Sequence, residues 1–231
     1  MDLIKKIIPV SIKKIYHLIK KKMEYVPVNE KVSFNINTIN DGHFNVTYRN
    51  IPTIRCPFDY VIYQMILSEV RPDLVIEIGT NVGGTTLYLA DLMEVMGHGM
   101  IHSIDIDKHF DSKIDNHPRI KLFMNGWQKY DLKNAENFAR ILVIEDASHM
   151  YRDSLHALYK FSPIVTKGSY YIVEDGIVNA LGREKGFEGG PLRAIKEFMS
   201  SNNDFSVDRK YCDLFGKNAT FNVNGYLKKI K

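Results

Sequence analysis

The chain has 231 residues, 45% of them hydrophobic and 25% charged, a composition typical of a globular protein large enough to bury its own core. Two cysteines without a CxxC pair exclude a disulfide scaffold, a zinc ribbon and a dithiol redox motif, and they favour a reducing cytoplasm. The first 24 residues carry a net charge of +5 and the remaining residues −1, which together give the net charge of +4. The body of the chain therefore offers no broad positive surface for nucleic acid.

Residues 1–25 predict a basic amphipathic helix, because isoleucines recur every three or four positions and lysines fall mostly between them. Such a helix can rest on an anionic membrane at the inner face. It can equally pack its isoleucines on the body of the protein or on a second subunit of a homo-oligomer. The chain shows no run of 18 apolar residues that would predict a transmembrane helix, and no signal-peptide pattern.

Residues 26–56 show no sustained period and are expected to form an irregular or short-stranded covering segment before one domain at residues 57–231. Within that domain, helices are predicted at 57–70, 85–96, 150–161 and 191–200, and strands at 74–78, 100–106, 119–123, 141–145 and 169–174. The tail suggests an antiparallel pair from 205–212 and 219–230. This alternation predicts an α/β fold whose mostly parallel sheet binds ligands beyond the carboxyl ends of its strands.

A glycine-rich turn follows the first strand of this domain and contains, in order, Glu77, Gly79, Asn81, Gly83 and Thr85. Glycines let the backbone turn tightly and approach a ligand closely. The pattern is not GxGxxG, so the dinucleotide fingerprint is not met. An acid directly before the first glycine suits an α-amino group or a sulfonium better than a pyrophosphate. Alternatively, Glu77 caps backbone amides of the turn.

Two further strand ends predict contacts to an adenosine. Asp105 follows Gly79 by 26 residues, which fits one βαβ step, and an acid at this place commonly accepts hydrogen bonds from ribose hydroxyls. After the next strand, Gly126, Trp127 and Gln128 offer an aromatic wall and an amide to an adenine, although a tryptophan more often belongs to the core.

Acidic residues gather at the next two strand ends, with Asp146 after one strand and Glu174 and Asp175 after the other. Neighbouring ends of a parallel sheet would bring these acids together, and they repel one another unless a cation lies between them. Oxygen ligands favour Mg²⁺, Mn²⁺ or Ca²⁺. His149 is expected on the first turn of the following helix as a general base. The alternative is that Asp146 and Asp175 are helix caps and Glu174 is solvated.

Several segments resemble the cephalosporin hydroxylase family. They are Arg71–Thr80, Gly83–Thr85, His102–Asp107, Asp146–His149, Gly168–Asp175, Pro191–Phe198 and Asn224–Lys228. The resemblance runs from about residue 50 to the C-terminus. It implies a Rossmann-like class I methyltransferase fold with a seven-stranded sheet, and a family that uses S-adenosylmethionine and includes sugar O-methyltransferases.

The chain is also similar, more distantly, to the catechol O-methyltransferase group, and this similarity assigns roles to single residues. The implied S-adenosylmethionine contacts are Glu77, Gly79, Asn81, Gly83, Thr85, Asp105, Gly126, Trp127, Gln128 and Asp146. The implied magnesium ligands are Asp146, Glu174 and Asp175, the last in place of an asparagine. His149 falls where that group has its catalytic lysine, so that His149 and Asp146 are the implied catalytic residues.

The implied reaction is a metal-dependent methyl transfer to a hydroxyl of a sugar or glycoconjugate. The cation would lower the pKa of the hydroxyl, and His149 would accept its proton. Residues 176–190 are glycine-rich, and they are expected either to form a lid whose Arg183 or Lys185 contacts the acceptor, or to be an ordinary loop. Two alternatives remain open: a hydroxylase-like tailoring enzyme on the same fold, and a non-catalytic oligomeric scaffold.

Overall fold

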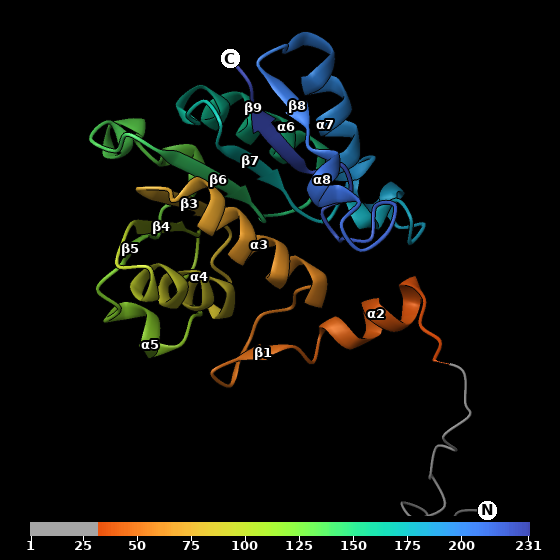
Figure 1. Ribbon diagram of the computed structural model, residues 1–231, viewed down its shortest axis with the longest axis horizontal. Coiled ribbons are helices and arrows are strands. Elements are labelled where there is room, and N and C mark those ends of the chain that lie inside the picture. Colours follow the sequence, from red (N-terminus) through yellow and green to blue (C-terminus); the bar gives the residue numbers. More distant parts are fainter. Residues whose placement is uncertain (1–31) are drawn as a thin grey trace, which may run out of the picture. The chain divides into compact units, whose positions relative to one another are not determined.

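Short apolar segments form one seven-stranded sheet in the computed structural model, which describes residues 32–231 (Figure 1). The strands are β3 (Leu74–Ile78), β4 (Met100–Ile104), β5 (Ile120–Phe123), β6 (Ile141–Glu145), β7 (Tyr170–Val173), β8 (Phe205–Val207) and β9 (Tyr226–Lys229). Their order in the sheet is β5-β4-β3-β6-β7-β9-β8. β5, β4, β3, β6 and β7 run parallel, whereas β9 pairs antiparallel with both β7 and β8. The predicted fold class is confirmed.

Helices connect these strands and precede them. The helices are α2 (Ile36–His43), α3 (Pro57–Val70), α4 (Gly84–Val95), α5 (Ser112–Asp115), α6 (Tyr151–Phe161), α7 (Gly190–Ser201) and α8 (Arg209–Cys212). Single 3-10 turns are η2 (Trp127–Lys129), η3 (Leu132–Ala135), η4 (Ser162–Ile164), η5 (Gly176–Val178) and η6 (Glu184–Phe187). Within residues 32–231, no helix combines the length and apolar character that crossing a bilayer requires.

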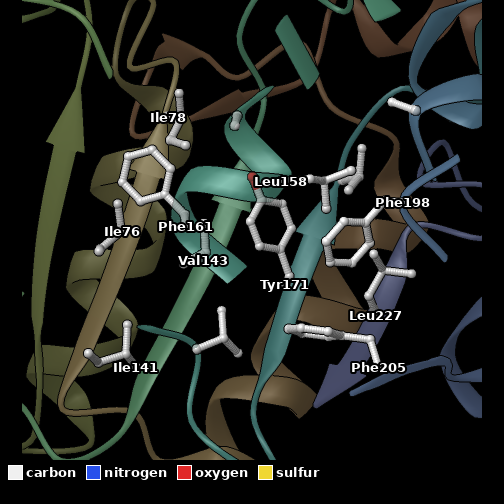
Figure 2. Close-up of a cluster of buried hydrophobic side chains, with 14 of the residues drawn as sticks. Ile76, Ile78, Ile141, Val143, Leu158, Phe161, Tyr171, Phe198, Phe205 and Leu227 are labelled. Atoms are coloured by element: carbon white, nitrogen blue, oxygen red, sulfur yellow. The ribbon is translucent and has the colours of Figure 1, made fainter. Parts of the chain in front are cut away.

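Every residue of β3 and β6 is buried, because helices cover both faces of the sheet. Since side chains alternate along a strand, Ile76 and Val143 face a cluster built on α6 and α7, while Val75 and Leu142 face one built on α3 and α4. Figure 2 shows the first cluster, in which aromatic and aliphatic side chains from the two helices lie over the strands. The carboxyl ends of the central strands are thereby held rigidly.

The structure differs from the sequence predictions at a few elements. Residues 209–212, expected in a strand, form α8, because the Asp208 side chain accepts a hydrogen bond from the Lys210 backbone amide and caps a helical turn. His149, expected on the first turn of a helix, lies before α6 with a φ of 56°. The covering segment contains the unpredicted α2. The helix predicted at residues 1–25 lies outside the described residues.

A short hairpin, β1 (Thr47–Tyr48) and β2 (Ile51–Pro52), leads the chain toward the sheet. Arg49 and Asn50 at its turn have φ values of 50° and 68°, as a tight hairpin turn requires. The Tyr48 hydroxyl donates a 2.9 Å hydrogen bond to Asp91 of α4. The residues after this hairpin reach the functional site.

Replacement of Ile76 by alanine should lower the free energy of unfolding by about 2–5 kcal/mol, because it leaves a cavity in the core. Ile76 is 0% exposed, whereas Ile106 is 70% exposed. The same replacement at Ile106 should therefore change stability by less than about 0.5 kcal/mol. Urea unfolding of both variants measures the difference, and equal losses would contradict this account of the core.

Candidate functional site

A cavity of about 470 Å³ lies beyond the carboxyl ends of β3, β4, β6 and β7, where the fold predicts a ligand. Eight of the ten residues predicted to contact a cofactor line it. They are Gly79, Asn81, Thr85, Asp105, Gly126, Trp127, Gln128 and Asp146. His149 and Asp175 line it too, as do Pro52, Thr53 and Ile54 after the β1–β2 hairpin. The cavity therefore joins the predicted cofactor loop to the predicted acidic cluster.

Two glycines shape the loop after β3, each for a different reason. Gly79 has a φ of 103°, and a Cβ on it would lie 2.0 Å from the Asp146 carbonyl oxygen, so only glycine lets the ends of β3 and β6 approach. Gly83 has a φ of 85°, and its missing Cβ makes room for Ile114. Gly83 packs behind the loop and is not among the residues that line the cavity.

Glu77 lies beneath this loop and also does not line the cavity. Its buried carboxylate accepts hydrogen bonds from the hydroxyls of Ser103, at 2.8 Å, and Thr86. Burial raises the pKa of Glu77 to about 7, although these hydroxyls act to lower it. Glu77 thus supports the loop from behind, through side chains of β4 and α4. The sequence had suggested a ligand contact or a backbone cap at this position.

Asp105 stands at the opposite side of the cavity from the acidic cluster. One oxygen accepts a 2.8 Å hydrogen bond from the Asn81 amide and the other a 2.7 Å bond from the Ile106 amide. These bonds fix the carboxylate between the glycine loop and the end of β4. Trp127 packs partly against the core and also lines the cavity, and its contact with an adenine stays a prediction.

Asp146, His149 and Asp175 converge where β6 and β7 end, with one potential ligand atom of each within 4.8 Å of the others. The His149 Nε2 atom lies 3.2 Å from Asp175 Oδ2, and the Nδ1 atom lies 4.0 Å from Asp146 Oδ1. His149 and Asp175 have φ values of 56° and 54°. Among non-glycine residues, aspartate and histidine adopt left-handed backbone more often than most, and here it accompanies the contact between their side chains.

Glu174, predicted alongside these acids, is turned away from the cavity. It is only 5% exposed. One carboxylate oxygen lies 2.5 Å from Arg55 Nη1, and the other accepts a 2.5 Å hydrogen bond from the Tyr63 hydroxyl. The structure thus brings Asp146 and Asp175 together at the cavity wall and places Glu174 behind them.

Arg55 is the residue of this site that the sequence analysis missed. It is 3% exposed, and besides Glu174 it contacts Asp146 Oδ2 at 3.0 Å and the Thr85 hydroxyl at 3.2 Å. Burial opposes the charge of a guanidinium, but Glu174 and Asp146 outweigh it and raise the pKa of Arg55. The sequence did contain a signal for Arg55. A charged residue next to the apolar start of a helix is buried only with a partner of opposite charge, so the acids at the strand ends could have been considered as partners.

The pKa of Asp146 is raised well above its usual value, because burial and the neighbouring Glu174 carboxylate disfavour its ionised form more than Arg55 favours it. Its Oδ1 atom faces His149 while its Oδ2 atom contacts Arg55. Crowded acids of this kind suit a divalent cation, which accepts carboxylate and imidazole ligands. The carboxylates of Asp146 and Asp175 therefore fit a cation, and the His149 imidazole beside them can serve either as a third ligand or as a base.

The predicted lid, residues 176–190, contains the η5 and η6 turns. Ile177 and Val178 are buried, which anchors its first part. The Phe187 ring lies edge-on to His149, with ring centroids 6.1 Å apart. No residue of this segment lines the cavity in the described structure, so contact of Arg183 or Lys185 with an acceptor stays a prediction.

Comparison with known proteins gives consistent matches. A model of the rhamnosyl O-methyltransferase/CmcI family matches residues 41–230. The rhamnosyl O-methyltransferase of Mycobacterium bovis (strain BCG / Pasteur 1173P2) is 31% identical over 192 residues, which cover 78% of this chain and 77% of the relative. A solved CmcI structure with SAH has a TM-score of 0.63 at 17% identity, covering 89% of this chain and 97% of its own. One with Mg and SAM has a TM-score of 0.62 at 18% identity, covering 89% of both chains.

Replacement of Glu77 by glutamine should change how stability depends on pH. The native pKa is raised, from 4.5 to about 7, so the native state holds this proton more tightly than the unfolded state does. As the pH rises from 4.5 to 7, the free energy of unfolding of the wild-type protein therefore falls. The glutamine variant has no proton to lose at this position, so its free energy of unfolding does not fall for this reason. The stability difference in favour of the variant should grow by about 3 kcal/mol between pH 4.5 and 7.

Guanidinium unfolding at several pH values measures this difference. The control is glutamine at the exposed Glu136, whose stability should follow the wild-type curve. A Glu77 variant that also follows the wild-type curve would contradict the ionisation assigned to Glu77.

Proposed function

The chain belongs to the rhamnosyl O-methyltransferase/CmcI family, and we propose that it transfers a methyl group from S-adenosylmethionine to a sugar hydroxyl with the help of a divalent cation. The family predicted from the sequence is confirmed, and so is the enzyme class, an O-methyltransferase. The observation that carries the proposal is the single cavity that joins Asp105 and the glycine loop to the acidic cluster.

The cofactor is proposed to lie along the glycine loop. Asp105 would accept hydrogen bonds from the ribose hydroxyls, while Trp127 and Gln128 would contact the adenine. The methionine part would then extend past Gly79 toward Asp146, both of which line the same cavity. The volume of about 470 Å³ is within the usual range for small-molecule sites. Once bound, S-adenosylmethionine supplies an electrophilic methyl group.

The cation is proposed to bind Asp146 and Asp175, the two acids at the cavity wall. Glu174, the third ligand that the sequence predicted, could join them only by sharing an oxygen that now contacts Arg55 or Tyr63. A bound divalent cation lowers the pKa of a hydroxyl that it coordinates. Because Asp146 and Asp175 fix the position of the cation, they would also fix the position of the acceptor hydroxyl bound to it.

His149 is proposed to accept the proton of the acceptor hydroxyl. A neutral imidazole is a suitable base near pH 7. Asp175 lies 3.2 Å from the Nε2 atom of His149, so it would fix the orientation of the ring and stabilise the imidazolium after proton transfer. The left-handed backbone of both residues is part of the arrangement that sets the two side chains against each other.

The acceptor class is proposed from the relatives, which are named for methylation of a rhamnosyl group. A cytoplasmic location is proposed because both cysteines are free and buried. Contact with an anionic membrane, and assembly with further copies of the chain, would depend on the N-terminal segment and stay proposals as well. The scaffold alternative offers no reason for closely grouped ionisable residues at the wall of a cavity, and relatives named for O-methyl transfer favour that reaction over the hydroxylase-like alternative.

Replacement of Asp105 by asparagine should weaken S-adenosylmethionine binding about 10- to 100-fold, the loss expected for charged hydrogen bonds to two ribose hydroxyls. Calorimetric titration measures the affinity. The matched control is asparagine at Asp41 of α2, which is exposed and does not line the cavity. That control should bind as the wild type does. Equal weakening in both variants, or none in either, would contradict the proposed ribose contact.

Replacement of His149 by glutamine should lower kcat about 10²- to 10⁴-fold, the usual contribution of a general base, while cofactor affinity stays unchanged. Transfer of labelled methyl groups to rhamnosides measures kcat. The loss should shrink as the pH rises, because hydroxide or an already ionised hydroxyl can replace the base. A variant that turns over at the wild-type rate would exclude this role for His149.

A further inference from the structure

Arg55 connects the proposed cation site to the interior of the protein. Its guanidinium lies 3.0 Å from Asp146 and 2.5 Å from Glu174, and its Nη1 atom also donates to the Tyr63 hydroxyl at 3.0 Å. Its Nε atom donates to Thr85, at the start of α4. With this set of partners, the arginine has little freedom to move away when a ligand arrives.

We propose that Arg55 is a resident counter-charge that competes electrostatically with the divalent cation and so sets its affinity. This inference rests on the cation site of the proposed function. It differs from a purely structural role, in which Arg55 would strengthen cation binding by holding the acids in place. The two roles predict opposite changes when the arginine is removed.

The charges of the site show why the competition matters. Asp146 and Asp175 are ionised when they bind a cation, and Glu174 carries a third negative charge in its ion pair with Arg55. Arg55 carries one positive charge, which leaves a net charge of −2. A single divalent cation neutralises that charge. Without Arg55 the site would carry −3 and attract the cation more strongly.

Burial increases the strength of this effect. Arg55 and Glu174 are almost fully buried, with side chains 2% and 6% exposed, so water screens their charges poorly. Arg55 touches Asp146 from the interior, through Oδ2, while Oδ1 faces His149. The arginine therefore leaves one oxygen of Asp146 for the cation while lowering the negative potential at that oxygen.

A permanent counter-charge has two consequences for the enzyme. The acids stay paired in the protein without cation, which limits the repulsion that would otherwise destabilise the fold. The cation is held less tightly than three acids alone would hold it. An additional oxygen ligand from the acceptor then makes a larger relative contribution to cation binding, so that cation and acceptor favour one another's binding.

The test is the affinity of Mn²⁺ for the full chain without substrates, measured from the electron paramagnetic resonance signal of free Mn²⁺. Replacement of Arg55 by glutamine should tighten binding at least about tenfold. Replacement by lysine, which keeps the charge, should leave the affinity within about threefold of wild type. The control is glutamine at Arg140, which contacts the Val70 carbonyl and does not line the cavity; its affinity should not change.

Removal of Arg55 leaves two acids without their partner and can prevent folding, so the comparison is repeated in a second protein. In that protein Glu174 is already replaced by glutamine, which removes the charge that pairs with Arg55. In the same protein, the further change of Arg55 to glutamine should again tighten Mn²⁺ binding at least about tenfold, because it replaces a buried cation by a neutral group. Circular dichroism confirms that each variant is folded.

The outcomes separate the two proposals. Weaker or unchanged Mn²⁺ binding after loss of Arg55 would overturn the counter-charge and assign Arg55 a structural role, with the cation site intact. Failure of the wild-type protein to bind Mn²⁺ would overturn the cation site and the counter-charge together. Tighter binding in the glutamine variants, with lysine close to wild type, is the result that the counter-charge requires.

Discussion

A buried guanidinium is the interaction on which the site depends. Arg55 joins the segment before α3 to the ends of β6 and β7, through Asp146 and Glu174. Buried ion pairs seldom add net stability, because desolvation of two charges offsets much of their attraction. A hydrophobic pair in the same place could serve the fold as well. The presence of full charges here therefore speaks for a role in the cavity rather than in stability.

The same network reaches the C-terminal part of the chain. Tyr63, which donates to Glu174, accepts a 3.1 Å hydrogen bond from Asn222, and Asn222 also donates to Tyr226 of β9. Tyr226 in turn donates to Asp59 at the start of α3. The antiparallel strand β9 thus does more than extend the sheet. Together with Asn222 in the segment just before it, β9 supplies the polar partners that hold α3, and with it Arg55 and Glu174, in register with the end of β7.

The sequence predicted the sheet well, because each parallel strand is a short run rich in apolar residues between turn residues, and the central strands β3 and β6 are buried on both faces. It also predicted most of the cavity wall, since ligands meet the carboxyl ends of such strands. It could not predict which carboxylates face the cavity. Glu77 and Glu174 turn inward because hydroxyls of Ser103 and Tyr63, or the charge of Arg55, lie there, and such partners are distant in the chain. The helix α2 and the site arginine fell in a segment without any period.

Left-handed backbone occurs at both ends of the cavity wall. At the cofactor end Gly79 and Asn81 adopt it, with φ values of 103° and 48°, and at the acidic end His149 and Asp175 adopt it. Glycine adopts this conformation nearly freely, and asparagine, aspartate and histidine adopt it more often than other residues do. Glycine is required at position 79 because a Cβ there would meet the Asp146 carbonyl oxygen. At the acidic end the same conformation goes with a contact between side chains, since His149 Nε2 lies 3.2 Å from Asp175 Oδ2. The cofactor end is therefore organised around close approach of the backbone, and the acidic end around contact between ionisable side chains.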